Sequence, residues 1–340
     1  MKEKTPVAVL GATGMVGQQL LTMLQDHPWF YVSEMVASER RAGIPYGETT
    51  RWMVDTTLPP AMALLTLKGP NEALASPLVF SCLGARVARD LEPVLVQNGH
   101  LVVSNASAFR RNPDVPLLIP EVNPESLRLL SAQRVIGGRG GLVTNPNCVV
   151  AGLALGLAPL HHAFRLTKAT VVTLQAVSGA GIPGVGAVEL VDNLIPWIEG
   201  EEDKIAYETA RILEAPLAIS ASVHRVAVLH GHTMSVSISM ERTPSREDII
   251  GAWEAFRPPG DVAGLPTCPL RPIVYVHDVQ RPQPRLDRMA GRGMSITIGR
   301  LRPCPVLGFA FELCVHNLVR GAAGAALLNA ELCARRGLIP

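Results

Sequence analysis

A glycine-rich turn near the start of the chain constrains the fold more than any other feature of the sequence. Residues 7–10 form a short apolar run, GATGMVG follows at residues 11–17, and a helical pattern begins at residue 18. Between a strand and a helix, glycines bring the backbone close to a pyrophosphate, and the helix N-terminus offers free N–H groups to the anion. A plain tight turn would also use three glycines, but this context favours a dinucleotide site. Its candidate contacts are Gly11, Thr13, Gly14, Met15, Val16 and Gly17.

The end of the second expected strand bears on the choice of nucleotide. That strand covers residues 31–37, and Ser38-Glu39-Arg40-Arg41 follows it. A hydroxyl and two guanidinium groups suit a 2′-phosphate, because arginine makes charge-assisted hydrogen bonds to phosphate. Glu39 could instead contact the ribose 2′-hydroxyl of NAD, and the three charged residues could simply form a solvated turn. We favour NADP, with Ser38, Arg40 and Arg41 as candidate contacts.

The pattern of strand-like and helix-like runs changes near the middle of the chain. A length of 340 residues also predicts two domains. In the first half, strand-like and helix-like runs alternate, as they do in a parallel sheet with crossover helices. These runs lie at residues 18–26, 78–82, 87–97 and 101–104. The second half predicts an α+β domain with a mixed sheet. Its longer strands are expected at residues 169–177, 220–229, 233–240, 294–300 and 306–316, and its helices at 149–160, 203–213 and 246–256. The Pro-rich residues 257–272 and 281–284 are expected to be surface loops, and residues 318–334 a terminal helix.

Charge and composition argue against several classes of protein. The 31 basic and 29 acidic residues nearly balance, which gives neither the electrostatic footprint of a nucleic-acid-binding protein nor a polybasic membrane patch. No uninterrupted apolar stretch reaches about 18 residues, and the first residues lack the features of a signal peptide. The six cysteines form no CxxC pair, so we expect no metal site. Their scatter along a long chain indicates reduced thiols and a cytoplasmic protein.

One cysteine stands apart from the other five. Asn145-Pro146-Asn147-Cys148 lies at the boundary between the halves, directly before an apolar helix. The positive end of a helix dipole lowers the pKa of a thiol and favours the thiolate. A lone cysteine is usually a small buried hydrophobe, which is how we interpret the others. For Cys148 the position predicts a nucleophile.

Seven segments carry a resemblance to a known family. In chain order they are GATGMVG, ASERRAG, SNASAFRRNPDVPLLIPEVNP, TNPNC, TLQAVSGAG, GEEDK and HRVAVLHGHT. Together they resemble the aspartate-β-semialdehyde dehydrogenase family, and ASERRAG with SNASAFR resembles its archaeal and fungal-like branch. The resemblance implies NADPH-dependent reduction of aspartyl-β-phosphate to aspartate-β-semialdehyde with release of phosphate. The product would serve lysine, methionine and threonine biosynthesis, and the protein would be a homodimer or homotetramer.

The resemblance also implies a division into domains. A Rossmann-type NADP-binding domain would comprise residues 1–147 and, because the last helix returns to it, residues 318–340. Residues 148–317 would form the catalytic and oligomerisation domain, in a fold like that of glyceraldehyde-3-phosphate dehydrogenase. Further cofactor contacts are implied at Ser178, Gly179 and Asn329, with Asn329 near the nicotinamide.

The resemblance also implies a role for single residues, matched position by position. Cys148 matches the family nucleophile, Gln175 the glutamine that positions the intermediate, and His232 the general acid/base. Arg225 matches the arginine that binds the substrate α-carboxylate, and Glu201 the carboxylate that binds the α-amine. The phosphate-holding residues are Arg110 and Lys204, with Asn147 beside the nucleophile. Taken singly, His232 could be an ordinary strand histidine, and residues 201–204 a solvated helix start.

Two departures and three alternatives stay open at this stage. Ala227 stands where the family often has proline, and His224 before Arg225 is untypical, so the substrate geometry could differ. The alternatives are a malonyl-CoA reductase, an N-acetyl-glutamyl-phosphate reductase and a non-catalytic NADP-binding regulator. The pair of Glu201 and Arg225 argues for a free amino-acid end, since neither acyl alternative offers an ammonium group to Glu201.

Overall fold

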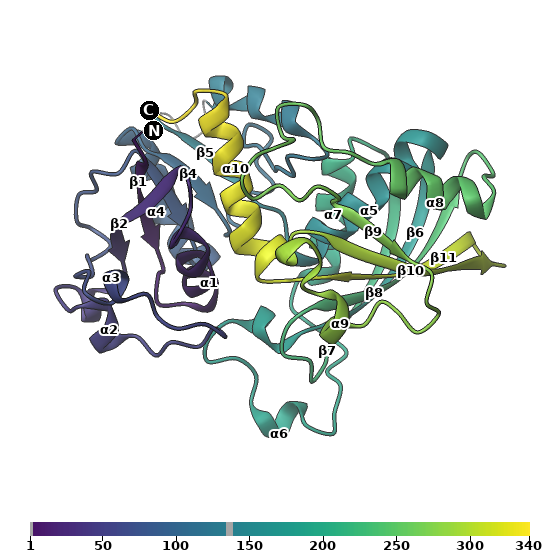
Figure 1. Ribbon diagram of the computed structural model, residues 1–340, viewed down its shortest axis with the longest axis horizontal. Coiled ribbons are helices and arrows are strands. Elements are labelled where there is room, and N and C mark those ends of the chain that lie inside the picture. Colours follow the sequence, from purple (N-terminus) through teal and green to yellow (C-terminus); the bar gives the residue numbers. More distant parts are fainter. Residues whose placement is uncertain (1–2, 134–138) are drawn as a thin grey trace.

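The computed structural model describes residues 3–133 and 139–340. Over these residues the chain builds two sheets that lie side by side, and helix α10 (Gly324–Arg335) runs between them (Figure 1). The first half of the chain forms one side of the molecule and the second half forms the other. The last helix therefore leaves the second half and returns to the first.

The first sheet is parallel, with strand order β2-β1-β3-β4-β5 among the described residues. This order and the crossover helices confirm the predicted Rossmann-type sheet. Its strands are β1 (Thr5–Leu10), β2 (Phe30–Val36), β3 (Leu78–Ser81), β4 (Leu101–Ser104) and β5 (Gly141–Thr144). Its helices are α1 (Met15–Leu24), α2 (Tyr46–Thr49), α3 (Pro60–Ala63) and α4 (Ala85–Gln97), with 3₁₀ turns η1 (Glu39–Arg41) and η2 (Pro124–Ala132). The sequence did not predict β5, which has only four residues and begins with glycine.

The second sheet is mixed, with strand order β7-β6-β8-β11-β10-β9 among the described residues. Its strands are β6 (Leu166–Gln175), β7 (Ala218–Arg225), β8 (His232–Met240), β9 (Ile273–Val276), β10 (Ile296–Cys304) and β11 (Gly308–Val315). Its helices are α5 (Cys148–Phe164), α6 (Ala187–Leu190), α7 (Glu201–Ile212), α8 (Arg246–Ala255) and α9 (Pro284–Asp287), with 3₁₀ turns η3 (Val177–Ala180) and η4 (Ala290–Gly293). The mixed α+β sheet is thus confirmed, although β9 follows directly on a predicted loop. The strand expected over residues 220–229 ends at Arg225, where the chain turns toward β8.

Strand β6 shows why this sheet has one covered face. Its residues alternate strictly, with Ala169, Val171 and Thr173 buried and Val172 and Leu174 about 40% exposed. The buried set packs with α5, which contacts β6, β8, β10 and β11. Such alternation is typical of a sheet with one core face, and the other face is open in the single chain.

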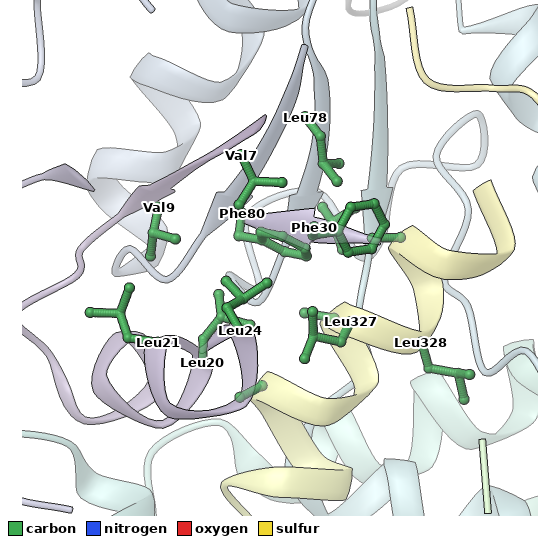
Figure 2. Close-up of a cluster of buried hydrophobic side chains, with 14 of the residues drawn as sticks. Val7, Val9, Leu20, Leu21, Leu24, Phe30, Leu78, Phe80, Leu327 and Leu328 are labelled. Carbon is green, nitrogen blue, oxygen red and sulfur yellow. The ribbon is translucent and has the colours of Figure 1, made fainter. Parts of the chain in front are cut away.

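The terminal helix completes the core of the first half. Leu327 and Leu328 of α10 share a cluster with Leu20 of α1 and with Phe30 and Phe80 of the sheet (Figure 2). The turn before α10 is a π-helix, η5 (Val319–Ala323), where the sequence predicted continuous α-helix. The same cluster also includes residues from the second half, Val262, Leu265 and Met294. The boundaries at residues 147/148 and 317/318 therefore stay a prediction.

Three further properties concern the described residues only. None of the helices there is long and apolar enough to cross a membrane. No group of three or more His, Cys, Asp or Glu residues in that part of the chain is arranged to hold a metal ion. All six cysteines are free thiols.

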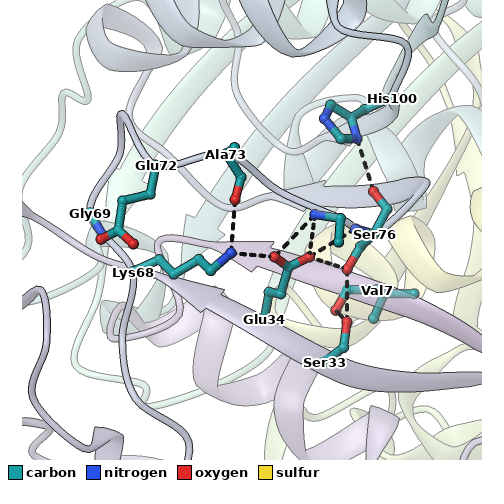
Figure 3. Close-up of polar contacts among 10 residues, drawn as sticks. Val7, Ser33, Glu34, Lys68, Gly69, Glu72, Ala73, Ser76 and His100 are labelled. Carbon is teal, nitrogen blue, oxygen red and sulfur yellow. Dashed lines mark hydrogen bonds and ion pairs between the residues drawn. The ribbon is translucent and has the colours of Figure 1, made fainter.

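A polar network centred on Glu34 fixes the outer edge of the first sheet (Figure 3). Glu34 lies on the edge strand β2, and its carboxylate accepts from the Lys68 ammonium at 2.7 Å and from the backbone N–H of Ser76 at 2.8 Å. Burial by itself raises the pKa of Glu34, but the hydrogen bonds from Lys68, Ser76 and Ala75 outweigh it and hold this pKa at about 2. The ionised carboxylate thus ties residues 68–76 to the sheet.

Glu34→Gln should lower the stability of the protein at neutral pH by about 1–2 kcal/mol, because it removes charge-assisted hydrogen bonds. The folded pKa lies below the unfolded one, so the contribution of Glu34 is present above about pH 4.3 and is lost as the pH falls toward 2. Urea unfolding of both proteins at pH 7 and pH 2.5 measures the difference. The exposed Glu254→Gln serves as control, and a gap between wild type and Glu34→Gln that is as large at pH 2.5 as at pH 7 would contradict this assignment.

Candidate active site

A cavity of about 540 Å³ lies between the two halves of the molecule. Its walls come from the turn before α1, the loops after β3 and β4, the starts of α5 and α7, the segment after β6 and the turn η5. The structure brings most of the predicted catalytic and substrate residues to this one place: Arg110, Asn147, Cys148, Gln175, Glu201, Lys204 and Arg225. His232 joins them through its contact with Cys148.

Cys148 is the first residue of α5, and its place is set by the cap before it. Asn147 has an extended backbone (φ −53°, ψ 147°), and its side-chain Oδ1 accepts from the N–H of Val149 at 2.9 Å. This is the usual way in which asparagine satisfies a free N–H group at a helix start. The Sγ atom of Cys148 lies 3.1 Å from Nε2 of His232, at the start of β8. A potential nucleophile and a potential proton carrier are therefore in direct contact.

The other nitrogen of His232 decides where its proton lies. Nδ1 of His232 accepts from the backbone N–H of Ala176 at 3.0 Å, so in the neutral ring the proton is on Nε2. Burial, with Arg225 and His316 nearby, lowers the pKa of His232 to about 3 and keeps the ring neutral. His232 thus directs an N–H group at the sulfur of Cys148 and is set up to donate a hydrogen bond at this place.

The predicted thiolate at Cys148 is not what the structure shows. Burial and the neighbouring Glu201 carboxylate raise the pKa of Cys148 to about 12, and Arg110, Arg225 and the N–H of Val149 offset them only in part. A helix dipole contributes about 0.3–1 kcal/mol, whereas desolvation of a buried ionisable group shifts a pKa by several units. The expectation of a lowered pKa was therefore wrong: burial shifts the pKa of Cys148 in the opposite direction.

Arg225 and Gln175 lie side by side at the ends of β7 and β6, where they are direct neighbours in the sheet. Nη1 of Arg225 donates to the carbonyl of Ala176 at 2.7 Å. The carbonyl of Ala176 therefore holds Arg225, and its backbone N–H holds His232. Gly179 packs against both, because a Cβ there would lie 2.9 Å from Arg225 Nη1 and 3.2 Å from His232 Cε1. The segment after β6 therefore fixes two of the candidate residues at once.

Charged groups line the wall around α7. Lys204 Nζ donates to Glu201 at 2.9 Å, and the Asn147 side chain donates to the other Glu201 oxygen at 2.8 Å. Arg110 lies on the loop after β4 and donates to the carbonyl of Asn105 at 2.7 Å. Arg110 and Lys204 place positive charge where a phosphate oxygen could bind, and Arg225 adds a third cation. Glu201 contributes the one lining carboxylate among the described residues.

The glycine turn has the geometry that its sequence predicted. Gly11 has a φ of +69°, and a Cβ there would lie 2.7 Å from the carbonyl oxygen of Cys82. A Cβ on Gly17 would lie 2.4 Å from the carbonyl oxygen of Gly11, so helix and turn pack too closely for a side chain. Gly14, Met15 and Val16 line the cavity, and the N-terminus of α1 faces it. Gly11, Thr13 and Gly17 form the turn behind them.

Besides Gly11, Thr13 and Gly17, four predicted cofactor contacts lie outside the cavity lining. Ser38, Arg40 and Arg41 are on or beside the turn η1, at the end of β2. Asn329 is fully buried in α10 and donates to the Asn145 side chain at 2.6 Å, so the structure does not place it at the cavity. Asn317, just before η5, lines the cavity instead.

Three groups that support the site were not predicted from the sequence. Asn317 donates to the Ser178 hydroxyl at 2.8 Å and accepts from the N–H of Gly231 at 2.9 Å, which links η3 to the start of β8. His230 lies 2.9 Å from the same Ser178 hydroxyl. Glu208, seven residues after Glu201, is buried behind Arg110 and Asn147. The sequence does contain a signal for Glu208, because a spacing of seven residues places it on the same helix face as Glu201. Nothing in the sequence distinguishes His230 from the neighbouring histidines.

Comparison with known proteins places the chain in a family. Residues 6–130 match the family model "Semialdehyde dehydrogenase, NAD binding domain", and residues 157–320 match "Semialdehyde dehydrogenase, dimerisation domain". The chain is 44% identical to the aspartate-semialdehyde dehydrogenase of Archaeoglobus fulgidus, over 98% of this chain and 99% of that protein. The chain belongs to the aspartate-semialdehyde dehydrogenase family. The resemblance seen in the sequence is thereby confirmed.

The fold agrees with that of solved members of the aspartate-semialdehyde dehydrogenase family. The crystal structure of the Candida albicans enzyme with NADP superimposes with a TM-score of 0.90 at 34% identity, covering 98% of this chain and all of that one. The archaeal and fungal relatives match the predicted branch. The family is not uniform in activity: a malonyl-CoA reductase (NADP) of Metallosphaera sedula is 34% identical over all of this chain and 99% of that protein.

Proposed function

We propose that this chain catalyses the NADPH-dependent reduction of aspartyl-β-phosphate to aspartate-β-semialdehyde, with release of phosphate. The observation that carries the proposal is the cavity itself, where a thiol in contact with a histidine is surrounded by three cations and one carboxylate. The substrate offers an acyl carbon, a phosphate, a carboxylate and an ammonium group. The phosphate and carboxylate groups find cations in the lining, the ammonium group finds a carboxylate, and the acyl carbon finds the thiol.

The residues suggest one acyl transfer to Cys148, followed by reduction of the thioester and release of the aldehyde. Sulfur attacks the acyl carbon, the C–S bond forms, and the bond to phosphate breaks. The thiol proton leaves with the phosphate, whose charge Arg110 and Lys204 stabilise. After reduction of the thioester, Nε2–H of His232 is placed to donate a hydrogen bond to the oxyanion next to sulfur. The C–S bond then breaks, the carbonyl group forms as the aldehyde leaves, and the sulfur of Cys148 regains a proton from solvent. Arg225 and Glu201 hold the α-carboxylate and α-ammonium groups throughout.

The turn before α1 fits a dinucleotide, because a side chain at Gly11 or Gly17 would collide with backbone and the free N–H groups of α1 face the cavity. Gly14, Met15 and Val16 would hold the pyrophosphate, and Ser178, Gly179 and Asn317 lie where the reactive end would meet Cys148. When bound, NADPH supplies the hydride. Arg40 and Arg41 lie at the end of β2, where a 2′-phosphate is expected.

Arg40→Ala should weaken NADP binding about tenfold, because it removes a charge-assisted hydrogen bond to the 2′-phosphate. NAD has no such phosphate, and its affinity should change by less than about twofold. Fluorescence titration of both nucleotides measures this, with the exposed Arg257→Ala as control. Equal losses for the two nucleotides would refute the role of Arg40.

The second candidate is the malonyl-CoA reductase activity found in a relative. Glu201 argues against it, because a CoA thioester brings no ammonium group to that carboxylate. Two assays separate the candidates: phosphate-dependent NADP⁺ reduction with aspartate-β-semialdehyde, and NADPH oxidation with malonyl-CoA. Turnover in the second assay alone would replace our proposal.

We also propose that the protein is a homodimer or homotetramer that works in the cytoplasm. The match to a dimerisation domain over residues 157–320 supports self-association. The open face of the second sheet, with Val172 and Leu174 about 40% exposed, is the surface we assign to the contact. Analytical ultracentrifugation checks the assembly state. Six free thiols suit a reducing compartment.

A further inference from the structure

We propose that Glu208 is a positioning residue that holds both the phosphate-binding Arg110 and the cap of the nucleophile's helix. This inference rests on the proposed function above. Glu208 does not line the cavity, so it does not touch the substrate. It lies on α7 seven residues after Glu201, on the same face of the helix, and is only 2% exposed.

The two oxygens of Glu208 have different partners, one on each side. Oε1 accepts from Nη1 of Arg110 at 3.2 Å, and Oε2 accepts from the backbone N–H of Asn147 at 2.6 Å. Arg110 comes from the loop after β4, and Asn147 is the cap of α5. One carboxylate thereby joins the loop that carries a phosphate-binding cation to the residue before Cys148.

Glu208 leaves Arg110 with a defined orientation and with a buried N–H group that is free to donate. Nη1 of Arg110 bonds Glu208 and Nη2 bonds the carbonyl of Asn105 at 2.7 Å, whereas the buried Nε has no partner among the described residues. A guanidinium is planar, so two fixed bonds set its plane. Arg110 is thus held in place before an anion enters, which removes the cost of ordering it on binding.

Asn147 is fixed from three directions. Its backbone N–H donates to Glu208, its side-chain N–H donates to Glu201 at 2.8 Å, and its Oδ1 accepts from the N–H of Val149. Glu201 and Glu208 therefore hold the cap from positions about two turns apart on one helix. Because Cys148 is the next residue, this also sets the distance between its sulfur and His232.

Glu208→Gln keeps the shape of the side chain but cannot accept from both partners, because its amide nitrogen must face one of two donors. We expect the KM for phosphate, in the direction from aspartate-β-semialdehyde, to rise about tenfold and kcat to fall about tenfold. The dissociation constant of NADP should stay within about twofold, since the glycine turn is untouched. Alkylation of Cys148 by iodoacetamide should be protected by phosphate in the wild type and much less in the variant.

The matched control is Glu214→Gln, which removes an exposed carboxylate just beyond α7. Glu208→Asp keeps the charge and is expected to show an intermediate phosphate KM; if Glu208→Gln does not fold, this variant carries the test. A phosphate KM and a phosphate protection equal to those of wild type in the folded variants would overturn the inference. A wild-type protein that turns over no aspartate-β-semialdehyde would instead overturn the proposed function.

Discussion

Replacing Cys148 with alanine is expected to lower kcat by at least about 10⁴-fold, the scale of loss seen when a covalent nucleophile is removed. No other thiol can take over, because Cys148 is the one cysteine in contact with His232 among the described residues. NADP should still bind, since the turn before α1 does not depend on the thiol. The assay is phosphate-dependent reduction of NADP⁺ with aspartate-β-semialdehyde, and fluorescence titration gives the NADP affinity.

The control for this variant is Cys304→Ala, at the far end of β10, which should leave kcat within about twofold of wild type. A Cys148→Ala protein with near wild-type turnover would remove the covalent mechanism. It would also revive the interpretation of this chain as an NADP-binding regulator, in which neither Cys148 nor His232 is needed.

Gly321→Ala should lower kcat about 100-fold, because the added methyl group displaces Cys148. A Cβ at residue 321 would lie 2.7 Å from the Cβ of Cys148 and 3.0 Å from its Cα. Alanine normally stabilises a helix by about 1 kcal/mol over glycine, but overpacking against a rigid neighbour costs about 1–3 kcal/mol. The second effect wins here because the new Cβ would meet the Cα and carbonyl oxygen of Cys148 as well as its Cβ, and pushing these atoms back moves the sulfur away from His232.

The same substitution at Gly251 is a matched control. Gly251 lies in α8, and a Cβ there would meet nothing within 4 Å. Gly251→Ala should therefore leave kcat unchanged and raise the melting temperature. If both glycine variants keep full activity, the close contact between η5 and Cys148 has no catalytic consequence.

Hydrophobic pattern and turn chemistry were enough to predict the architecture. Long apolar or alternating runs predicted β1, β6, β8 and β11, and the glycine turn predicted where the parallel sheet begins. The strands missed, β5 and β9, have four residues each, but so do β3 and β4, which were predicted. What differs is the setting: β5 begins with glycine, and β9 follows directly on a Pro-rich run. The residues of β9 become a strand because β10 pairs with them, and that partner is distant in sequence.

The identity of the site residues was accessible to sequence, but their electrostatics were not. The pKa of Cys148 depends on burial, which is a property of the folded chain, and burial reversed the expected direction. Asn329 and Asn317 both sit in or near a terminal helical pattern. Asn317 precedes the π-helix η5 and lines the cavity, whereas Asn329 is buried in α10 against Asn145, and hydrophobic spacing does not distinguish these two places.

The return of α10 to the first sheet has a consequence for how the chain is made. A ribosome finishes β5 well before it reaches residues 324–335, and the interval from residue 144 to residue 335 takes roughly 10–40 s of synthesis. During that time the apolar face that Leu327 and Leu328 later cover is open to water (Figure 2). The second sheet, in contrast, is complete once β11 has emerged. The half that is translated first is therefore the half that finishes folding last, and nascent chains stalled before residue 324 should be the ones that chaperones bind.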